Sequence, residues 1–213
     1  MNTVIAIDGT SASGKSTNAR LLAKELGFIH VDTGAMYRTL AWHCLCRKAD
    51  LTNTKLIARI CRTWKARLEN TSTGLVLSVK GHIPGDELRS PEVSAAASIV
   101  SMVPAVRRWM RKTQRDCLQF GNLVMEGRDI GTNVFPETNF KYYLDANLSA
   151  RIGRRKLEQD IEARDKRDSQ RACAPLMLGL GAKYIDTSNL EVTETLSLLL
   201  TDIRAKLNTE TKN

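Results

Sequence analysis

Gly9-Thr10-Ser11-Ala12-Ser13-Gly14-Lys15-Ser16 places two glycines, a lysine and a hydroxyl at the spacing of a phosphate-binding P-loop. The run Val4-Ile5-Ala6-Ile7-Asp8 just before it has the apolar composition of a buried parallel strand. Behind the loop, apolar residues recur at helical spacing between positions 19 and 26. The sequence therefore predicts a strand, a loop and a helix in succession, which is the context in which this spacing binds phosphate.

The chemistry of the loop follows from its residue types. Glycines allow backbone angles that other residues rarely adopt, so successive N–H groups can point inward as a nest for an anion. The N-terminus of the following helix strengthens this nest. We predict that residues 9–17 bind the phosphates of a nucleotide and that Lys15 supplies a mobile positive charge near the β and γ phosphates. Ser16 has the position of the hydroxyl that meets Mg²⁺, although Thr17 could share or replace it.

Composition sets further bounds. The 213-residue chain carries 32 Lys and Arg against 23 Asp and Glu, a net charge of +9. This excess favours a polyanionic partner, either a nucleotide or a nucleic acid. The chain has no apolar run long enough for a membrane span and no signal-peptide pattern, so we expect a cytoplasmic protein. The five cysteines lack CxxC spacing, and we expect reduced, mostly buried thiols at Cys44, Cys46, Cys61, Cys117 and Cys173.

Strand and helix patterns alternate along most of the chain. Apolar runs predict strands at 28–31, 122–126, 140–145 and 182–186. Helical patterns follow residue 32 and occur at 91–101, 104–119 and 196–207. The pattern changes from about 55 to 117, where 66–69 and 75–80 predict an antiparallel pair around a turn at 72–74. We therefore predict a single α/β domain with a doubly wound parallel sheet of about five strands and helices on both faces, the architecture of P-loop kinases.

Glu126 is a second candidate for the metal. It ends the predicted strand 122–126 and runs into Gly127-Arg128-Asp129-Ile130-Gly131-Thr132. Because the carboxyl ends of parallel strands meet at one edge of a sheet, this loop should lie beside the P-loop. Glu126 could then hold a Mg²⁺-bound water, as a strand-end carboxylate does in other P-loop enzymes. His30 and His43 lack ligand-like partners, and we expect them to be packing residues.

These motifs together make the chain resemble the bacterial cytidylate kinases over most of its length. Besides the P-loop, the resemblance rests on Asp32-Thr33-Gly34-Ala35-Met36-Tyr37-Arg38, the loop 127–132 followed by Val134-Phe135-Pro136, Arg164-Asp165-Lys166-Arg167-Asp168 with Arg171, Ala174-Pro175-Leu176, and Ile185-Asp186-Thr187-Ser188. It implies transfer of the γ-phosphoryl group of ATP to CMP or dCMP in pyrimidine nucleotide metabolism, with Mg²⁺ as cofactor. It also implies an antiparallel-sheet insertion in the monophosphate-binding region, which residues 55–117 resemble.

The resemblance also divides the domain. It implies a core of 1–32, 118–150 and 172–213, a monophosphate-binding region at 33–117 and an arginine-rich lid at 151–171. The lid is shorter than is usual in the family, since eight residues separate Arg155 from Arg164. Either the lid is naturally trimmed or the sequence omits a stretch of it.

Individual roles are carried over by the same resemblance. Ser98, Arg107 and Asp129 match the family's cytosine readers, and cytosine offers an amino donor for a carboxylate and ring acceptors for a guanidinium or a hydroxyl. Asp168 matches the residue that holds the ribose hydroxyls. The other substrate-binding matches are Thr33, Gly34, Tyr37, Arg38, Arg128, Arg164 and Arg171. The guanidinium groups of the four arginines suit phosphate. The implied catalytic set, which stabilises charge without a general base, is Lys15, Arg128 and the lid residues Arg151 and Arg155.

Two alternatives remain open at the level of sequence. A P-loop kinase for another small metabolite would use the P-loop and the arginines but not the cytosine readers. A nucleotide switch or an RNA-binding protein would fit the P-loop and the charge, but the chain lacks an Asn/Thr-Lys-x-Asp guanine motif and only 5% of its residues are aromatic. We therefore expect ATP and CMP or dCMP as partners, no nucleic acid, no membrane and a monomer.

Overall fold

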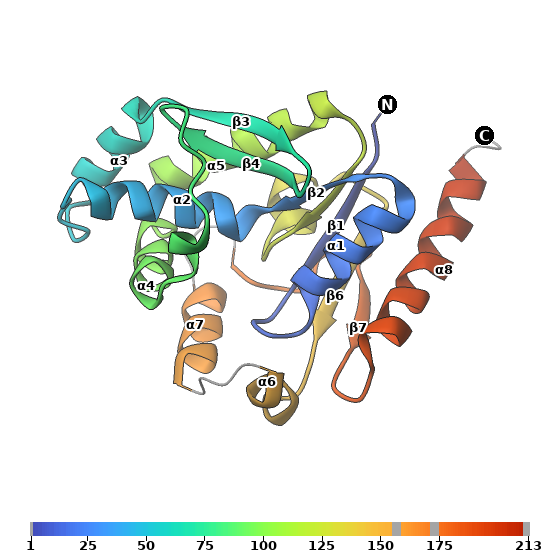
Figure 1. The fold of residues 1–213 in the computed structure, drawn as a ribbon. Helices are drawn as coiled ribbons and strands as arrows, with labels where there is room; N and C mark the ends of the chain where they lie inside the picture. The colour runs from blue at the N-terminus through green and yellow to red at the C-terminus, as the bar shows by residue number, and fades with distance from the viewer. Residues whose placement is uncertain (1, 155–158, 171–174, 211–213) are drawn as a thin grey trace.

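The computed structural model describes residues 2–154, 159–170 and 175–210. Within these ranges, one seven-stranded sheet of order β3-β4-β2-β5-β1-β6-β7 lies between two layers of helices (Figure 1). Five of its strands run parallel: β1 (Val4–Gly9), β2 (Ile29–Asp32), β5 (Leu123–Glu126), β6 (Phe140–Asp145) and β7 (Lys183–Asp186). The prediction of a doubly wound α/β domain is confirmed.

The two remaining strands correct the predicted strand number. β3 (Ala66–Thr71) and β4 (Gly74–Val79) form the expected antiparallel hairpin. β4 also pairs in parallel with β2 through Val31 and Leu75, so the hairpin extends the main sheet to seven strands instead of about five. Gly74 permits this approach, because its φ is 121° and a Cβ there would collide with the His30 carbonyl oxygen.

The central strands β1, β5 and β6 are buried on both faces, which is why they read as continuous apolar runs. Side chains of β1 alternate between faces: Val4 and Ala6 belong to one core cluster, and Ile5 and Ile7 belong to the other. The second cluster is covered by α1 (Lys15–Leu26) and α8 (Val192–Glu210). The first is covered, on the opposite side of the sheet in Figure 1, by α2 (Thr33–Cys46), α3 (Thr54–Thr63), α4 (Pro91–Val100) and α5 (Pro104–Asp116).

Local signals set most helix ends. Gly27 ends α1 in the left-handed region at φ 66°. Asp32 caps α2 by accepting a hydrogen bond from Ala35 N at 2.8 Å. Pro91 and Pro104 begin α4 and α5, where the missing N–H has no cost. Helix α3 is not among the predicted helices, although its Asn53 cap is a standard start signal.

Three of the shorter elements lie near the carboxyl ends of the parallel strands. The charged stretch 149–171 contains two helices, α6 (Leu148–Arg154) and α7 (Gln159–Ser169) (Figure 1). Directly after β5, the chain makes a π-helical turn, η3 (Ile130–Val134), a rare conformation that recurs at functional sites. Two 3₁₀ turns, η1 (Asp86–Arg89) and η2 (Cys117–Phe120), complete the described elements.

The cysteines within the described residues are free thiols. Cys44, Cys61 and Cys117 are buried and Cys46 is exposed, while Cys173 lies outside the described residues. Burial raises the pKa of Cys117 to about 12, so this thiol is inert near neutral pH. None of the helices in the described ranges is both long and apolar enough to cross a membrane.

Candidate functional site

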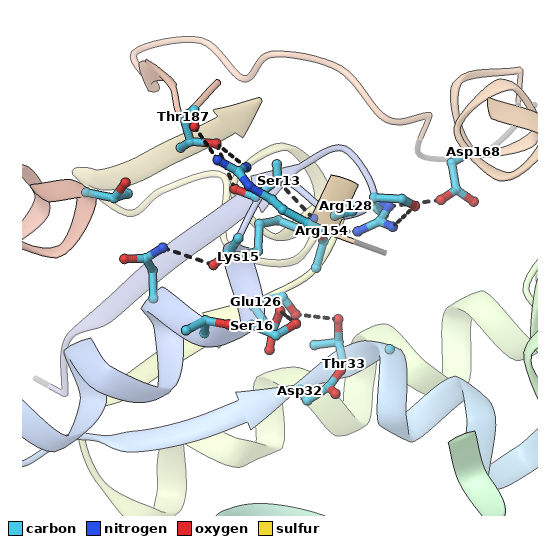
Figure 2. Close-up of a pocket in the computed structure, with 18 of the residues that line it drawn as sticks. Ser13, Lys15, Ser16, Asp32, Thr33, Glu126, Arg128, Arg154, Asp168 and Thr187 are labelled. Carbon is cyan, nitrogen blue, oxygen red and sulfur yellow. Dashed lines mark hydrogen bonds and ion pairs between the residues drawn. The ribbon is translucent and has the colours of Figure 1, made fainter. Parts of the chain in front are cut away.

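A cavity of about 840 Å³ opens at the carboxyl ends of β1, β2 and β5 (Figure 2). The P-loop and the start of α1 form one wall, through residues 11–18. The remaining walls come from 32–34 with Tyr37 and Arg38, from Ala97, Ser98 and Ser101 of α4, from 126–129, from Ala150, Arg154 and Asp168, and from 187–192 with Thr195. The cavity thus gathers residues from all parts of the chain.

The P-loop has the geometry that its glycines require. Gly9 leaves β1 at φ 142°, where a Cβ would collide with the Leu144 backbone, and Gly14 caps α1 at φ 86°. Lys15 is buried, and its Nζ donates to the Thr10 carbonyl oxygen and lies 3.4 Å from Ser13 Oγ. The ammonium group therefore lies inside the curve of the loop, where a bound phosphate would meet it.

Ser16 and Glu126 lie side by side in this wall. Ser16 Oγ donates to Glu126 Oε2 at 2.5 Å, and Thr33 Oγ1 donates to the Glu126 carbonyl oxygen at 2.7 Å (Figure 2). His30 Nε2 lies 3.2 Å from Glu126 Oε1, so His30 is a polar partner of this carboxylate and not only the packing residue that we expected. His43 does pack, buried between the rings of Trp42 and Trp64.

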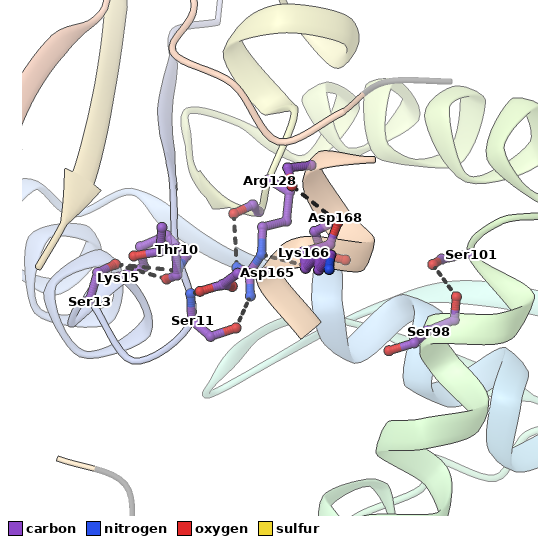
Figure 3. A network of polar contacts seen from close by, with 12 residues as sticks. Thr10, Ser11, Ser13, Lys15, Ser98, Ser101, Arg128, Asp165, Lys166 and Asp168 are labelled. Atoms are coloured by element: carbon purple, nitrogen blue, oxygen red, sulfur yellow. Dashed lines mark hydrogen bonds and ion pairs between the residues drawn. The ribbon is translucent and has the colours of Figure 1, made fainter. Parts of the chain in front are cut away.

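The other end of the cavity, away from the P-loop, is at Ser98 of α4 (Figure 3). The other two predicted cytosine readers, Arg107 and Asp129, form a buried ion pair, and of these two Asp129 lines the cavity. Asp129 Oδ2 accepts from Arg107 Nη2 at 2.7 Å and from Asn133 Nδ2 at 2.9 Å. Arg107 is 7% exposed and stands behind the wall, with its guanidinium carbon 5.8 Å from the centre of the Tyr37 ring. Ser98 lines the cavity on α4, far from Lys15 and Thr10 in Figure 3.

Arg128 lies between these two ends. Its Nε is 2.9 Å from Asp168 Oδ2, and its Nη2 donates to Ser11 Oγ at 2.8 Å (Figure 3). A guanidinium in this position can reach phosphate groups arriving from either side. The second arginine of this region, Arg38, donates to Asp32 Oδ2 at 2.8 Å. Burial alone raises the pKa of Asp32, but the Arg38 charge and the Ala35 N–H outweigh it and hold that pKa below its usual range.

Two lid arginines, Arg151 and Arg154, make contacts with different partners. Arg151 pairs with Asp165, which also accepts from Ser11 N at 2.9 Å. Arg154 lines the cavity and donates to Thr187 through both its Nη1 and its Nη2. Of the other predicted residues, Arg155 and Arg171 lie outside the described residues, and only the backbone of Arg164 is described, in α7.

Three of these contact residues have no role assigned from the sequence. Asp165 and Thr187 belong to motifs that the resemblance singles out, so a signal is present, but their partners Ser11 and Ser13 are more than a hundred residues away. Arg154 is not in the predicted catalytic set with Arg151 and Arg155, because a helical repeat does not say which of several arginines faces the cavity.

Comparison with known proteins identifies the family of this chain. The family model described as cytidylate kinase matches residues 5–205. A cytidylate kinase of Pelotomaculum thermopropionicum is 38% identical over 94% of this chain and 96% of its own length. Those of Desulfitobacterium hafniense and Bacillus cereus are 38% and 35% identical, over 98% and 92% of this chain and 95% and 93% of their own lengths. This chain belongs to the cytidylate kinase family.

Proposed function

We propose that this kinase transfers the γ-phosphoryl group of ATP to CMP or dCMP, giving CDP or dCDP and ADP. One observation carries the proposal: a single cavity is lined by the P-loop at one end, by Ser98 at the other and by Asp129, whose carboxylate pairs with the buried Arg107 behind the wall (Figure 3). The first end suits a triphosphate, and the second suits the polar edge of a pyrimidine.

Cytosine selection follows from the acceptor at Asp129. An ionised carboxylate accepts hydrogen bonds but cannot donate them, so it matches the exocyclic amino group of cytosine. Uracil presents a carbonyl oxygen at the same place, which would face the carboxylate without a proton between them. Arg107 holds Asp129 in one orientation, and a site built on fixed polar groups rejects a base that leaves them unpaired.

The middle of the cavity suits the monophosphate and its sugar. Arg128 and Arg38 would grip phosphate oxygens with their planar forks, Thr33 would add a hydroxyl, and Gly34 and Tyr37 complete this wall. Asp168 would accept from the ribose hydroxyls, and Arg164 and Arg171 remain candidates for the same phosphate from the lid side. The 187–192 wall beside the P-loop would take the adenosine of ATP.

Transfer then needs mainly alignment. An oxygen of the CMP phosphate forms a bond to the γ phosphorus while the bond from that phosphorus to the β–γ bridging oxygen breaks, and ADP leaves with the electron pair. Lys15 and Arg128, with Arg151 and Arg155 of the lid, would stabilise charge on the oxygens of the transferring group. Closure of the lid 151–171 over the region 33–117 would exclude water and suppress ATP hydrolysis.

The side chains of Ser16 and Glu126 suit Mg²⁺ as a bound ion. A hydroxyl and a buried carboxylate offer the oxygen ligands that this cation prefers. Within the described ranges, no cluster of three or more His, Cys, Asp or Glu could hold a metal by itself, which suits an ion held jointly with nucleotide phosphates. Ser16 would bind the ion and Glu126 would hold one of its waters. The chemistry that bound Mg²⁺ supplies is neutralisation of phosphate charge.

The test is a coupled assay of ADP release with CMP, dCMP, UMP, AMP and no acceptor. We expect the highest kcat/KM with CMP or dCMP. The proposal would be refuted if neither CMP nor dCMP were turned over faster than UMP, AMP or ATP without an acceptor. We also propose that the protein is a cytoplasmic monomer that uses neither nucleic acid nor membrane. The mass of the purified protein in solution tests the monomer, and its activity in the absence of nucleic acid and membrane tests the independence from both.

A further inference from the structure

Asp8 is a buried carboxylate at the end of β1, directly before the first glycine of the P-loop. It is 5% exposed. Its Oδ1 accepts from Ile130 N at 2.8 Å, and its Oδ2 accepts from Gly131 N at 2.7 Å. One side chain therefore joins the start of the P-loop to the turn that follows Asp129.

The π-helical turn η3 explains why these two N–H groups need an outside acceptor. The first N–H groups of any helical turn have no carbonyl partner within it. In η3, the Asp129 carbonyl oxygen accepts from Asn133 N and Val134 N, and the Ile130 carbonyl oxygen accepts from Phe135 N. The N–H groups of Ile130 and Gly131 precede these bonds, and the Asp8 carboxylate satisfies both of them.

Holding a carboxylate at this position has a cost. Burial and, to a lesser extent, the nearby Asp129 raise the pKa of Asp8, the two N–H groups and Lys15 lower it, and the net result is a pKa of about 6. An apolar residue would avoid this desolvation, but it would leave two buried N–H groups without an acceptor. A carboxylate is therefore favoured at this position only because it accepts hydrogen bonds from the Ile130 and Gly131 N–H groups.

We propose that Asp8 is a positioning residue for pyrimidine selection, fixing the backbone that carries Asp129 and Arg128 relative to the P-loop. The inference rests on the proposed function and extends it. The Asp129 carboxylate reads the base only from the correct place, and displacement of a site residue by about 1 Å can cost a hundredfold in rate. Asp8 acts through Asp129 and touches neither nucleotide.

Gly131 supports the same assignment from the other side of the contact. A Cβ at Gly131 would lie 3.2 Å from Lys141 Cγ and 3.5 Å from Asp8 Oδ2. A methyl group there would be in ordinary van der Waals contact with Asp8, and the Lys141 side chain would have to move slightly to admit it. Gly131→Ala adds a methyl group beside the Asp8 contact and should shift the turn slightly without changing any polar group.

The experiment compares Asp8→Asn with the parent enzyme. The amide oxygen of Asn can accept a hydrogen bond from one of the two N–H groups, but its NH₂ group is a donor and would face the other N–H group without an acceptor between them. We expect the KM for CMP to rise by about tenfold to a hundredfold, the range for a lost hydrogen bond to a charged group, and UMP to be rejected less strongly. The KM for ATP should change by no more than about twofold, within the scatter of such effects. Hydrogen exchange at the Ile130 and Gly131 amides should become faster.

Asp202→Asn is the matched control. Asp202 accepts from Tyr142 OH at 2.7 Å and from Lys183 Nζ at 2.8 Å, outside the cavity, so its amide variant should lose stability and keep both KM values. Gly131→Ala should raise the KM for CMP in the same direction as Asp8→Asn but by less, and it decides the question if Asp8→Asn does not fold.

Two outcomes would overturn the inference. One is Asp8→Asn with parental KM for CMP and parental discrimination against UMP. The other is a fall in kcat with both KM values unchanged, which would assign Asp8 a role in phosphoryl transfer and none in pyrimidine selection. If the parent enzyme does not phosphorylate CMP, the proposed function fails separately, and amide exchange at Ile130 and Gly131 still tests the contact.

Discussion

Ser16 Oγ and Glu126 Oε2 are joined by a hydrogen bond of 2.5 Å, although 110 residues separate them in the sequence. The contact follows from the strand order, because β5 pairs in parallel with β1 and places Glu126 opposite Ile7. The P-loop that follows β1 and the carboxylate that ends β5 therefore meet at the same edge of the sheet. Long-range contacts of this kind define the whole site.

The metal assignment predicts the behaviour of Glu126→Gln. A neutral amide holds a metal-bound water less well, so the free Mg²⁺ needed for half-maximal activity should rise by about tenfold or more. A Mg²⁺ titration of the rate at saturating ATP and CMP measures this. The matched control is Glu137→Gln, at an exposed carboxylate that pairs with Arg115. Identical Mg²⁺ curves for the parent and Glu126→Gln would contradict the assignment.

Lys15→Met should reduce kcat. Removing a positioned positive charge from the transferring phosphate costs about a hundredfold to a thousandfold in rate, as for other preorganised electrostatic groups. CMP binding, measured by calorimetry, should change little, since Lys15 lies in the P-loop wall. Lys24→Met tests the specificity of the effect, because Lys24 is an exposed residue of the same helix and its loss should leave kcat unchanged.

Asp129→Ala separates cytosine selection from general kinase activity. It removes the carboxylate that compensates the buried Arg107, so unfolding should become easier by about 3–5 kcal/mol, the usual cost of breaking a buried pair. Even where the variant is folded, kcat/KM for CMP should fall by about a hundredfold, since a base amino group loses its charged acceptor. Thermal melts and CMP kinetics check both effects. Retained activity would favour a kinase for another small metabolite.

Ionisation of Asp202 should make the stability of the fold depend on pH. Burial raises its pKa, but hydrogen bonds from Lys183, Tyr142 and Lys206 outweigh this and lower it from 3.8 to about 2. Because the folded-state pKa is the lower one, the contribution to stability is complete above about pH 4 and is lost as the pH falls toward 2. Asp202→Asn should therefore melt at a lower temperature than the parent at pH 7, and the two melting temperatures should converge near pH 2. A constant difference across this range would show that ionisation of Asp202 is not what stabilises the fold.

Sequence by itself determined the local elements and the family. The spacing of Gly9, Gly14, Lys15 and Ser16 predicts the P-loop, and continuous apolar runs predict the five parallel strands, because backbone conformation and two-sided burial are recorded in neighbouring residues. Gly27 and Asp32 mark helix ends for the same reason. These elements can therefore be predicted from neighbouring residues alone, without the contacts that distant residues make.

Tertiary structure decided which distant residues meet. The hairpin's attachment to β2, the pairing of Arg154 with Thr187, and the acceptance of two η3 amides by Asp8 all depend on strand order and crossover. His30 shows the limit most directly: its residue type and neighbours indicated packing, yet the adjacent β5 strand brings Glu126 within 3.2 Å of it. A periodic pattern reports which face of an element is buried, whereas the partner on that face is fixed only when the sheet assembles.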